Sequence, residues 1–172
     1  MTSERSADFW IRRLELRAHP EGGYYREIYR STETIDVPSL PARYRGNRAW
    51  GTSIYFLLKS SEPSNFHRLL TDEIWHFYAG GSLTLHTLTS DGTYGTNRLG
   101  PDFDEGERFQ LVIPAGTWFG ANVNPTGTFA LIGCTLAPGF DFADFELGRR
   151  EDLATRFPAH REIIEKLTPA AG

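Results

Sequence analysis

Short runs in which hydrophobic residues alternate with polar ones follow one another through the middle of the chain. Turn residues separate these runs, among them the pairs Gly80-Gly81 and Asp91-Gly92. A period of two, together with many Ile, Phe, Tyr and Trp residues, is typical of strands. The pattern predicts strands over residues 24–31, 52–59, 64–69, 73–79, 83–90, 108–113, 117–122 and 129–136. Many short strands without intervening helices indicate an all-β sandwich or barrel.

Helical spacing of hydrophobic residues is found near the two ends of the chain. Residues 6–17 predict a short helix, and Ser6 or Asp8 can cap its N-terminus. Residues 149–167 predict a closing amphipathic helix. Pro158 is expected to kink or divide this second helix, because proline lacks the N–H group that continues helical hydrogen bonding.

Two segments show no period. The sequence HPEGG at 19–23 precedes the first strand; a residue before proline avoids the helical region, and two glycines permit a tight reversal. We interpret this segment as a backbone reversal, which does not by itself imply catalysis. The polar segment 33–48 contains two prolines and predicts a loop that could act as a lid.

Composition narrows the class of protein. The 172 residues fit one domain, and 40% hydrophobic and 23% charged residues are typical of a globular protein. The net charge of −4 and the lack of a basic run argue against a nucleic-acid surface. Cys134, the single cysteine, is expected to be a buried structural thiol. The sequence has no signal-peptide core or membrane-spanning stretch, so we expect a cytoplasmic protein that does not bind membranes.

One stretch, residues 65–81, concentrates the candidate chemistry. It reads NFHRLLTDEIWHFYAGG, which predicts strand, turn and strand. His67 and Leu69 are two residues apart, so both side chains point to the same face of the first strand. Glu73 opens the second strand. The stretch therefore predicts a histidine and a glutamate that face each other across a hairpin, at the edge of an apolar layer.

This spacing resembles the first motif of the cupin superfamily, which is His-x-His, three or four residues, Glu, six residues and Gly. The four motif positions are occupied here by His67, Leu69, Glu73 and Gly80. The second cupin motif, Pro-x-Gly followed by a His, resembles residues 114–119, where Phe119 replaces the His. Two of the four usual metal ligands are therefore apolar, and the resemblance implies a pocket without the usual metal or another cofactor.

More narrowly, the chain resembles the small cupin-5 family, also known as DUF985. The stretches that carry this resemblance are residues 19–31, 52–58, 66–81, 111–121 and 133–148. The resemblance implies a double-stranded β-helix, or jelly roll, with a short N-terminal helix and a C-terminal helix over about 149–167. It implies a single cupin domain over 1–172, with its motif-bearing core at about 8–148, and pairing of two copies into a homodimer.

His67 and Glu73 are the candidate catalytic residues. The cupin resemblance places both inside the barrel. A carboxyl group among aromatic rings is costly to ionise, so burial is expected to raise the pKa of Glu73 towards neutrality, which suits a general acid or base. The alternative is that Glu73 is a buried structural partner of an arginine.

The candidate substrate-binding residues are mainly aromatic, and each could equally be ordinary core. They are Tyr24, Tyr55, Asn65, Trp75, His76, Trp118 and Phe119. Aromatic walls with a few polar groups are typical of small-molecule sites. The position of His76 is open: strict alternation turns it away from Glu73, whereas a bulge would bring it into the pocket or supply a third metal ligand. His86 is expected to face outward by the same alternation.

Three functions remain open at this point. The first, by resemblance to cupin epimerases, is a metal-independent isomerase or epimerase acting on a sugar nucleotide or a similar carbonyl substrate. His67 or Glu73 would be the base, and Tyr24 or Tyr55 would be the acid. The second is a protein that binds a small carbohydrate or nucleotide without chemistry. The third, weakened by Leu69 and Phe119, is a metal-dependent cupin enzyme.

Overall fold

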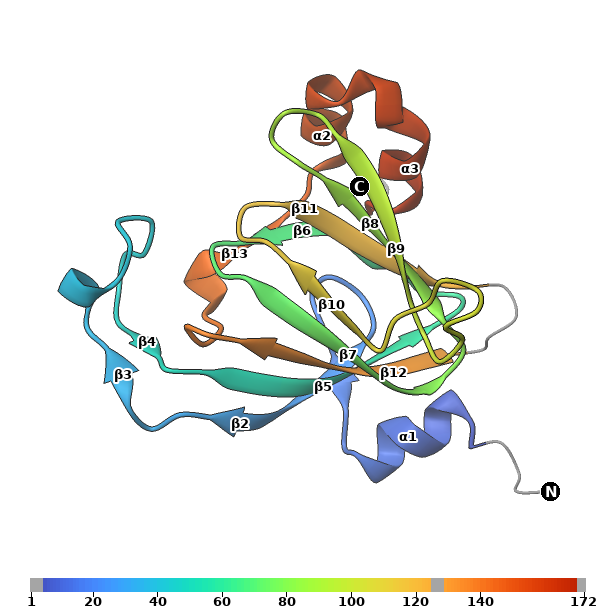
Figure 1. The fold of residues 1–172 in the computed structure, drawn as a ribbon, viewed down its shortest axis with the longest axis horizontal. Coiled ribbons are helices and arrows are strands. Elements are labelled where there is room, and N and C mark those ends of the chain that lie inside the picture. Colours follow the sequence, from blue (N-terminus) through green and yellow to red (C-terminus); the bar gives the residue numbers. More distant parts are fainter. Residues whose placement is uncertain (1–4, 125–128, 170–172) are drawn as a thin grey trace.

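Two antiparallel β-sheets pack face to face and form the jelly roll that the sequence predicts (Figure 1). The computed structural model describes residues 5–124 and 129–169. The six-stranded sheet has the order β1 (Arg17–Ala18), β2 (Tyr24–Arg30), β5 (Thr52–Lys59), β12 (Phe129–Leu136), β7 (Glu73–Gly80) and β10 (Gln110–Ile113). The five-stranded sheet has the order β13 (Phe145–Leu147), β6 (Ser64–Leu69), β11 (Trp118–Val123), β8 (Leu83–Leu88) and β9 (Tyr94–Leu99).

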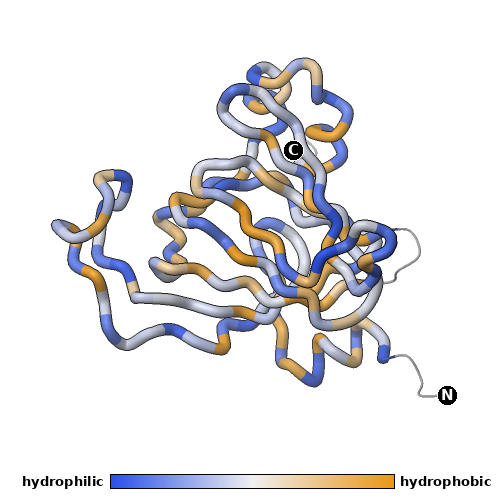
Figure 2. The backbone as a smooth tube through the Cα atoms, in the orientation of Figure 1, coloured by the Kyte–Doolittle hydropathy of each residue, from blue (hydrophilic) through white to orange (hydrophobic). Residues whose placement is uncertain are grey.

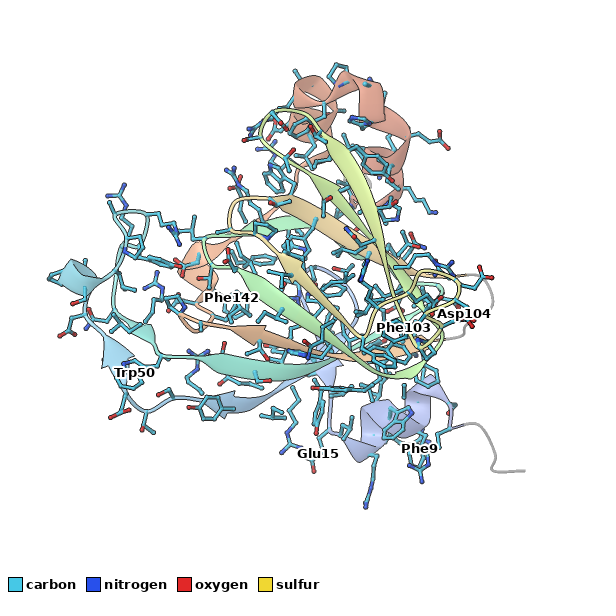
Figure 3. The ribbon with its side chains drawn as sticks, in the orientation of Figure 1. Phe9, Glu15, Trp50, Phe103, Asp104 and Phe142 are labelled. Carbon is cyan, nitrogen blue, oxygen red and sulfur yellow. The ribbon has the colours of Figure 1, made fainter. Side chains whose placement is uncertain are left out.

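The main core lies between the two sheets, where alternate residues of each strand point inward. Phe56, Trp75, Phe119 and Ile132 are among its fully buried side chains. Figure 2 shows hydrophobic colouring along the strands in the middle of the molecule. Each of these large side chains contributes about 2 kcal/mol through its burial, so the inner faces stabilise the sandwich.

Helices cover the outer faces of both sheets. The helix α1 (Ala7–Arg13) packs beside Leu57 and Leu131 of the six-stranded sheet, and the Ser6 side chain accepts a hydrogen bond from the Phe9 N–H at 3.2 Å. On the five-stranded sheet, Phe66 and Trp118 pack against the C-terminal helices (Figure 1). These are α2 (Arg150–Arg156), the 3₁₀ turn η3 (Pro158–His160) and α3 (Arg161–Lys166), so Pro158 divides the predicted helix.

Residues 33–48 form an arm that extends beyond the barrel (Figure 1). The sequence predicts a loop here, but the segment contains β3 (Thr34–Ile35), the turn η1 (Val37–Ser39) and β4 (Arg48–Ala49), with β3 and β4 paired. At the base of the arm, the Arg48 guanidinium donates two hydrogen bonds to the Asp144 carboxylate, at 2.6 and 2.5 Å. Asp144 ends the turn η2 (Phe142–Asp144) that precedes β13.

Strand β9 is the largest element that the hydrophobic pattern does not predict. Its sequence, YGTNRL, contains few apolar residues, because β9 is an edge strand and one face of it meets solvent. Among the described residues, no helix is long and apolar enough to cross a membrane.

Candidate functional site

A cavity of about 380 Å³ opens between the two sheets. The lining comes from the segment 17–30, the first half of β5, the end of β6, the start of β7, the end of β12 and the loop after β12. Its inner end is formed by five titratable side chains, which are His19, Glu21, His67, Glu73 and Cys134. Its mouth carries exposed charged residues, which are Arg17, Glu27, Arg30 and Asp141. Tyr25, Phe56, Phe140, Phe142 and Phe145 form an aromatic wall between the two ends.

A glycine turn places Glu21 at the inner end. Gly22 has a φ of +109°, and a Cβ there would come within 2.3 Å of the Pro63 carbonyl oxygen. The chain therefore needs glycine at this reversal. Two groups from β6 fix the glutamate: the Ser64 hydroxyl donates to its Oε1 at 2.8 Å, and the Asn65 side chain donates to its carbonyl oxygen at 2.7 Å.

His67 and Glu21 form a buried pair that shares a proton. His67 Nδ1 lies 2.8 Å from the Asn65 carbonyl oxygen, which only accepts, so Nδ1 carries a hydrogen. His67 Nε2 lies 3.1 Å from Glu21 Oε2. Burial lowers the pKa of His67 to about 3, and burial together with the charge of Glu73 raises the pKa of Glu21 well above its usual range. The proton between Nε2 and Oε2 therefore belongs to Glu21, and the pair is neutral.

His19 stands beside this pair in a cage of aromatic rings. Its ring centroid lies 4.7 Å from that of Tyr25 and 6.0 Å from that of Phe145. Nδ1 of His19 accepts the backbone N–H of Glu21 at 3.3 Å and lies 3.4 Å from Glu21 Oε2. Burial lowers the pKa of His19 to about 4, so its imidazole is neutral at physiological pH.

Glu73 is a buried carboxyl group that forms no ion pair within the described residues. It is the first residue of β7 and lies opposite Ile113 of β10 and Leu136 of β12. Its Oε2 atom has no hydrogen-bond partner within the described residues. Burial raises the pKa of Glu73 to about 7, and the neighbouring Trp75 and Cys134 offset only part of that rise. A carboxyl group with this pKa can take up and release a proton near neutral pH.

Cys134 of β12 completes the inner end. The thiol is buried, and desolvation, followed by the charges of Glu73 and Glu21, raises its pKa well above its usual range. A thiol held in its protonated form is a poor nucleophile. Its place in the lining is consistent with an apolar surface beside Glu73, and the expectation of a buried thiol is confirmed.

The residues present do not fit the metal site that is usual for cupins. Leu69 presents an apolar side chain to the cavity, and the Phe119 ring centroid lies 4.0 Å from that of His67. Both ring nitrogens of His67 already have partners. Within residues 5–124 and 129–169, no three His, Cys, Asp or Glu side chains are arranged to hold a metal ion. We therefore derive no step through a metal.

Of the residues predicted for the site, the structure brings His67 and Glu73 together in the cavity lining. Trp75 and Phe119 belong to the core behind it, with ring centroids 6.1 Å apart. Asn65 lies outside the lining, where its carbonyl oxygen fixes the His67 ring and its amide fixes the Glu21 backbone.

Four other predicted binding residues lie away from the cavity. Tyr24 and Tyr55 point to the outer face of the six-stranded sheet, where they pack near α1, and Trp118 packs under the C-terminal helices. His76 follows strict alternation and bonds to the Gln110 side chain at 3.0 Å on the far face of β7. The β7–β12 register does shift, but only beyond Phe77, so the bulge does not bring His76 inward.

The sequence pattern missed the contribution of the segment before the first long strand. Arg17, His19, Glu21 and Tyr25 all line the cavity, whereas HPEGG was interpreted only as a reversal. One signal was present: His19 and Glu21 are two titratable residues with a spacing of two inside the HPEGG segment. The same spacing brought His67 and Leu69 onto one face.

Comparisons with known proteins agree with the fold. Residues 8–148 match the model of the family Cupin_5, described as Cupin superfamily (DUF985). An uncharacterized protein of Saccharomyces cerevisiae is 32% identical over 147 residues, which are 80% of this chain and 73% of the yeast protein.

Solved structures extend the likeness along the whole chain. A protein of Shewanella oneidensis has 44% identity and a TM-score of 0.86, over 96% of this chain and 98% of its own. A hypothetical protein from Leishmania major has 34% identity and a TM-score of 0.87, over 96% and 99%. Oxalate decarboxylase, at 20% identity and a TM-score of 0.52 over 90% of this chain and 37% of its own, shares the fold.

Proposed function

This chain belongs to the Cupin_5 family of the cupin superfamily (DUF985), and from that premise we propose that it is an isomerase or epimerase. It moves a proton on a small carbonyl compound, such as the keto sugar of a sugar nucleotide. One observation carries the proposal: the buried Glu73, with a pKa of about 7 and an Oε2 atom that has no partner among the described residues, shares a cavity with a Glu21–His67 pair that holds one proton. A base and an acid in one apolar pocket are what proton transfer at carbon requires.

In the proposed reaction, ionised Glu73 removes a proton from the carbon next to the carbonyl group. The C–H bond breaks, its electron pair forms the C=C bond of an enolate, and the proton moves to Glu73. The Glu21–His67 pair then gives a proton to the opposite face of the same carbon, which gives the epimer. Where that carbon carries a hydroxyl group, the hydroxyl proton moves to the enolate oxygen and the pair protonates the former carbonyl carbon instead, which gives the isomer. Exchange with solvent then returns the proton from Glu73 to Glu21. Glu21 and Glu73 both line the inner end of the cavity, so one substrate can contact the two carboxyl groups.

The size of the cavity supports a small reacting group. A volume of about 380 Å³ lies at the lower end of the range for small-molecule sites, roughly 300–1,000 Å³. A sugar ring fits such a space, and the rest of a sugar nucleotide would extend through the charged mouth. The aromatic wall offers flat apolar faces to the C–H side of a sugar.

The second candidate function is binding without turnover, and the aromatic wall favours it equally. In that case Glu73 and the Glu21–His67 pair only orient the ligand. Self-association into a homodimer also stays a prediction. The half-exposed Ile28 and Tyr29 of β2, with Trp50 beside the arm, would form the contact between copies.

Exchange of substrate hydrogen for deuterium separates turnover from binding. The wild-type protein in D₂O is expected to exchange the C–H hydrogens next to the carbonyl group of one or more ketoses, 4-keto sugar nucleotides or small ketones, followed by ¹H NMR. Glu73→Gln keeps the shape of the side chain but cannot act as a base, so exchange is expected to fall by about 10²- to 10⁴-fold.

The matched control is Arg68→Gln, because Arg68 pairs with Glu146 outside the cavity. This variant should exchange at the wild-type rate. Saturable binding of a compound without hydrogen exchange, unchanged in Glu73→Gln, would replace the isomerase by the binding function. No exchange and no binding across the panel would reject both.

A further inference from the structure

Three side chains of one short segment line the cavity, one at its mouth and two at its inner end. Arg17 begins β1, His19 follows this strand, and Glu21 stands in the glycine turn after it. Glu21 is buried at the inner end, His19 is almost fully buried, and Arg17 is exposed at the mouth. The segment thus offers a cation at the mouth, and a neutral imidazole and a carboxyl group at the inner end.

Arg17 is the available cation of the two arginines at the mouth. Arg30 is held by two hydrogen bonds to Glu27, at 3.0 and 2.7 Å, and by one to the Phe140 carbonyl oxygen at 3.0 Å. Arg17 forms no ion pair with any residue in the described part of the chain; its guanidinium lies 5.0 Å from the ring centroid of Tyr25. A guanidinium placed on an aromatic ring keeps its edge free for a planar or tetrahedral anion.

His19 offers a hydrogen-bond donor deeper in the cavity. Its Nδ1 accepts the backbone N–H of Glu21, so the neutral ring carries its hydrogen on Nε2. Within the described residues Nε2 has no hydrogen-bond partner, and the ring lies in the cavity lining. A neutral imidazole held by aromatic rings can stabilise an oxygen on which negative charge develops.

We propose that the substrate of this site is a small carbonyl compound with an anionic group, a carboxylate or a phosphate. Arg17 binds the anionic group at the mouth, and the Nε2–H of His19 donates a hydrogen bond to the carbonyl oxygen. The carbon next to the carbonyl group then lies towards Glu73. This inference rests on the proposed function, and it adds the class of substrate and a further catalytic residue, His19.

The charge distribution fixes the direction in which such a substrate enters. The inner end contains two carboxyl groups, Glu21 and Glu73, whose negative charge or acceptor oxygens disfavour an anion. At the mouth, Glu27 is paired with Arg30, and the Asp141 carboxylate accepts the backbone N–H of Ala143. Arg17 is the cation left for a ligand, so the anionic group stays beside it. When the C–H bond breaks, the proton moves to Glu73, the electron pair forms the enolate, and His19 holds the enolate oxygen without transferring its own proton.

The test compares pairs of ketones that differ in charge. The probes are 2-oxobutanoate against butanone, and hydroxyacetone phosphate against hydroxyacetone, each followed by hydrogen–deuterium exchange in ¹H NMR and by saturation-transfer NMR for binding. The wild-type protein is expected to bind the charged member of at least one pair tenfold or more tightly, since hydrogen bonds to charged groups are worth about that much. The two pairs distinguish a carboxylate from a phosphate.

Two variants assign the roles. Arg17→Gln is expected to remove the preference for the charged probe, and Arg17→Lys to keep part of it; Arg26→Gln, a surface arginine paired with Glu15, is the control that keeps all of it. His19→Phe keeps an aromatic ring in the cage but has no donor. It is expected to lower exchange of a bound probe by about 10²-fold while binding of the anion is retained.

The outcomes separate this inference from the proposed function. Selective binding of the charged probes without hydrogen exchange would keep the anion site and reject catalysis. Hydrogen exchange of charged and neutral probes at equal rates would keep the isomerase and overturn the anion site. Unchanged exchange in His19→Phe would overturn the role of His19. If neither charged probe binds up to tens of millimolar, the substrate class is wrong.

Discussion

His67 and His86 are buried histidines on opposite faces of the same five-stranded sheet. His67, on β6, faces the cavity, and His86, on β8, faces the C-terminal helices. Both ring nitrogens of His86 have uncharged partners: Nδ1 lies 2.7 Å from the Tyr94 hydroxyl and Nε2 lies 2.9 Å from Asn122 Oδ1. His67 instead has a carboxyl group on one side. The comparison is therefore between a closed polar network and one that contains a mobile proton.

Burial lowers the pKa of both histidines, so burial by itself does not distinguish a site from a structural network. What distinguishes them is the surroundings. Beside His67 lie a cavity and a second carboxyl group, Glu73, whose Oε2 atom has no partner among the described residues. Around His86, Asn122 and Tyr94 satisfy the ring, and His160 stacks on Tyr94 at 5.2 Å. A satisfied network stabilises a fold, and an unsatisfied one can bind and react.

The largest predicted effect comes from making the same substitution on both faces. His67→Asn removes the partner that shares the Glu21 proton, and we expect hydrogen exchange of a carbonyl substrate to fall about 10³-fold, or about 4 kcal/mol of transition-state stabilisation. His86→Asn is expected to leave exchange unchanged and to lower the free energy of unfolding by about 2 kcal/mol, since two buried hydrogen bonds are lost.

Circular dichroism and urea unfolding show whether each variant is folded before its rate is compared. Equal loss of activity in the two variants would mean that His67 acts only through the stability of the sheet. The contrast between the faces would then have no bearing on function.

The next effect is the contribution of Glu73 to the pH dependence of the free energy of unfolding. Its pKa rises from 4.5 to about 7 on folding, so the native state holds a proton that the unfolded chain has already lost. The stabilisation from this group is complete below pH 4.5 and is lost as the pH rises to about 7, a total of about 3 kcal/mol. In Glu73→Gln this loss is absent. Relative to the wild type, the free energy of unfolding of the variant should therefore rise by up to that amount between pH 5 and 8.

The histidines of the cavity act in the opposite direction. The pKa values of His19 and His67 are lowered on folding, to about 4 and about 3, so their stabilisation is complete above pH 6.5 and is lost as the pH falls below it. Subtracting the wild-type curve from the Glu73→Gln curve cancels this contribution. The part of the Glu21 shift that the Glu73 charge causes adds to the difference in the same direction. Urea unfolding at half-unit steps from pH 5 to 8 measures the difference, and a flat difference would show that Glu73 is ionised in the folded protein.

The sequence predicted the sheet better than it predicted the cavity. Strands β5, β6 and β12 have the predicted bounds, and His67 and Glu73 lie where the hairpin pattern puts them. A buried strand repeats every two residues, so its bounds and its inner face follow from the positions of a few large apolar side chains. The same pattern placed His86 on the outer face.

The remainder of the site depended on contacts between distant segments. On β2, Tyr25 points inward and Tyr24 points outward. Because both are tyrosines, no difference in polarity shows which of them faces the cavity. His19 and Glu21 meet His67 across 48 and 46 positions of sequence, through a turn whose direction only the folded chain shows. The hydrophobic pattern of a short segment cannot predict a contact between residues so far apart in the sequence.

The smallest predicted effect tests whether the network around His86 is closed in the way its geometry indicates. Tyr94→Phe removes the hydroxyl that bonds His86 Nδ1 and leaves a buried ring nitrogen without a donor, which costs about 1 kcal/mol of unfolding free energy. Tyr78→Phe is the matched control, because Tyr78 is about half exposed and its hydroxyl has no hydrogen-bond partner among the described residues. Neither variant should change hydrogen exchange of a carbonyl substrate.

A change in exchange with Tyr94→Phe would mean that the outer face communicates with the cavity through the sheet. His67 and His86 would then belong to one functional unit, and the contrast between the two faces would fail.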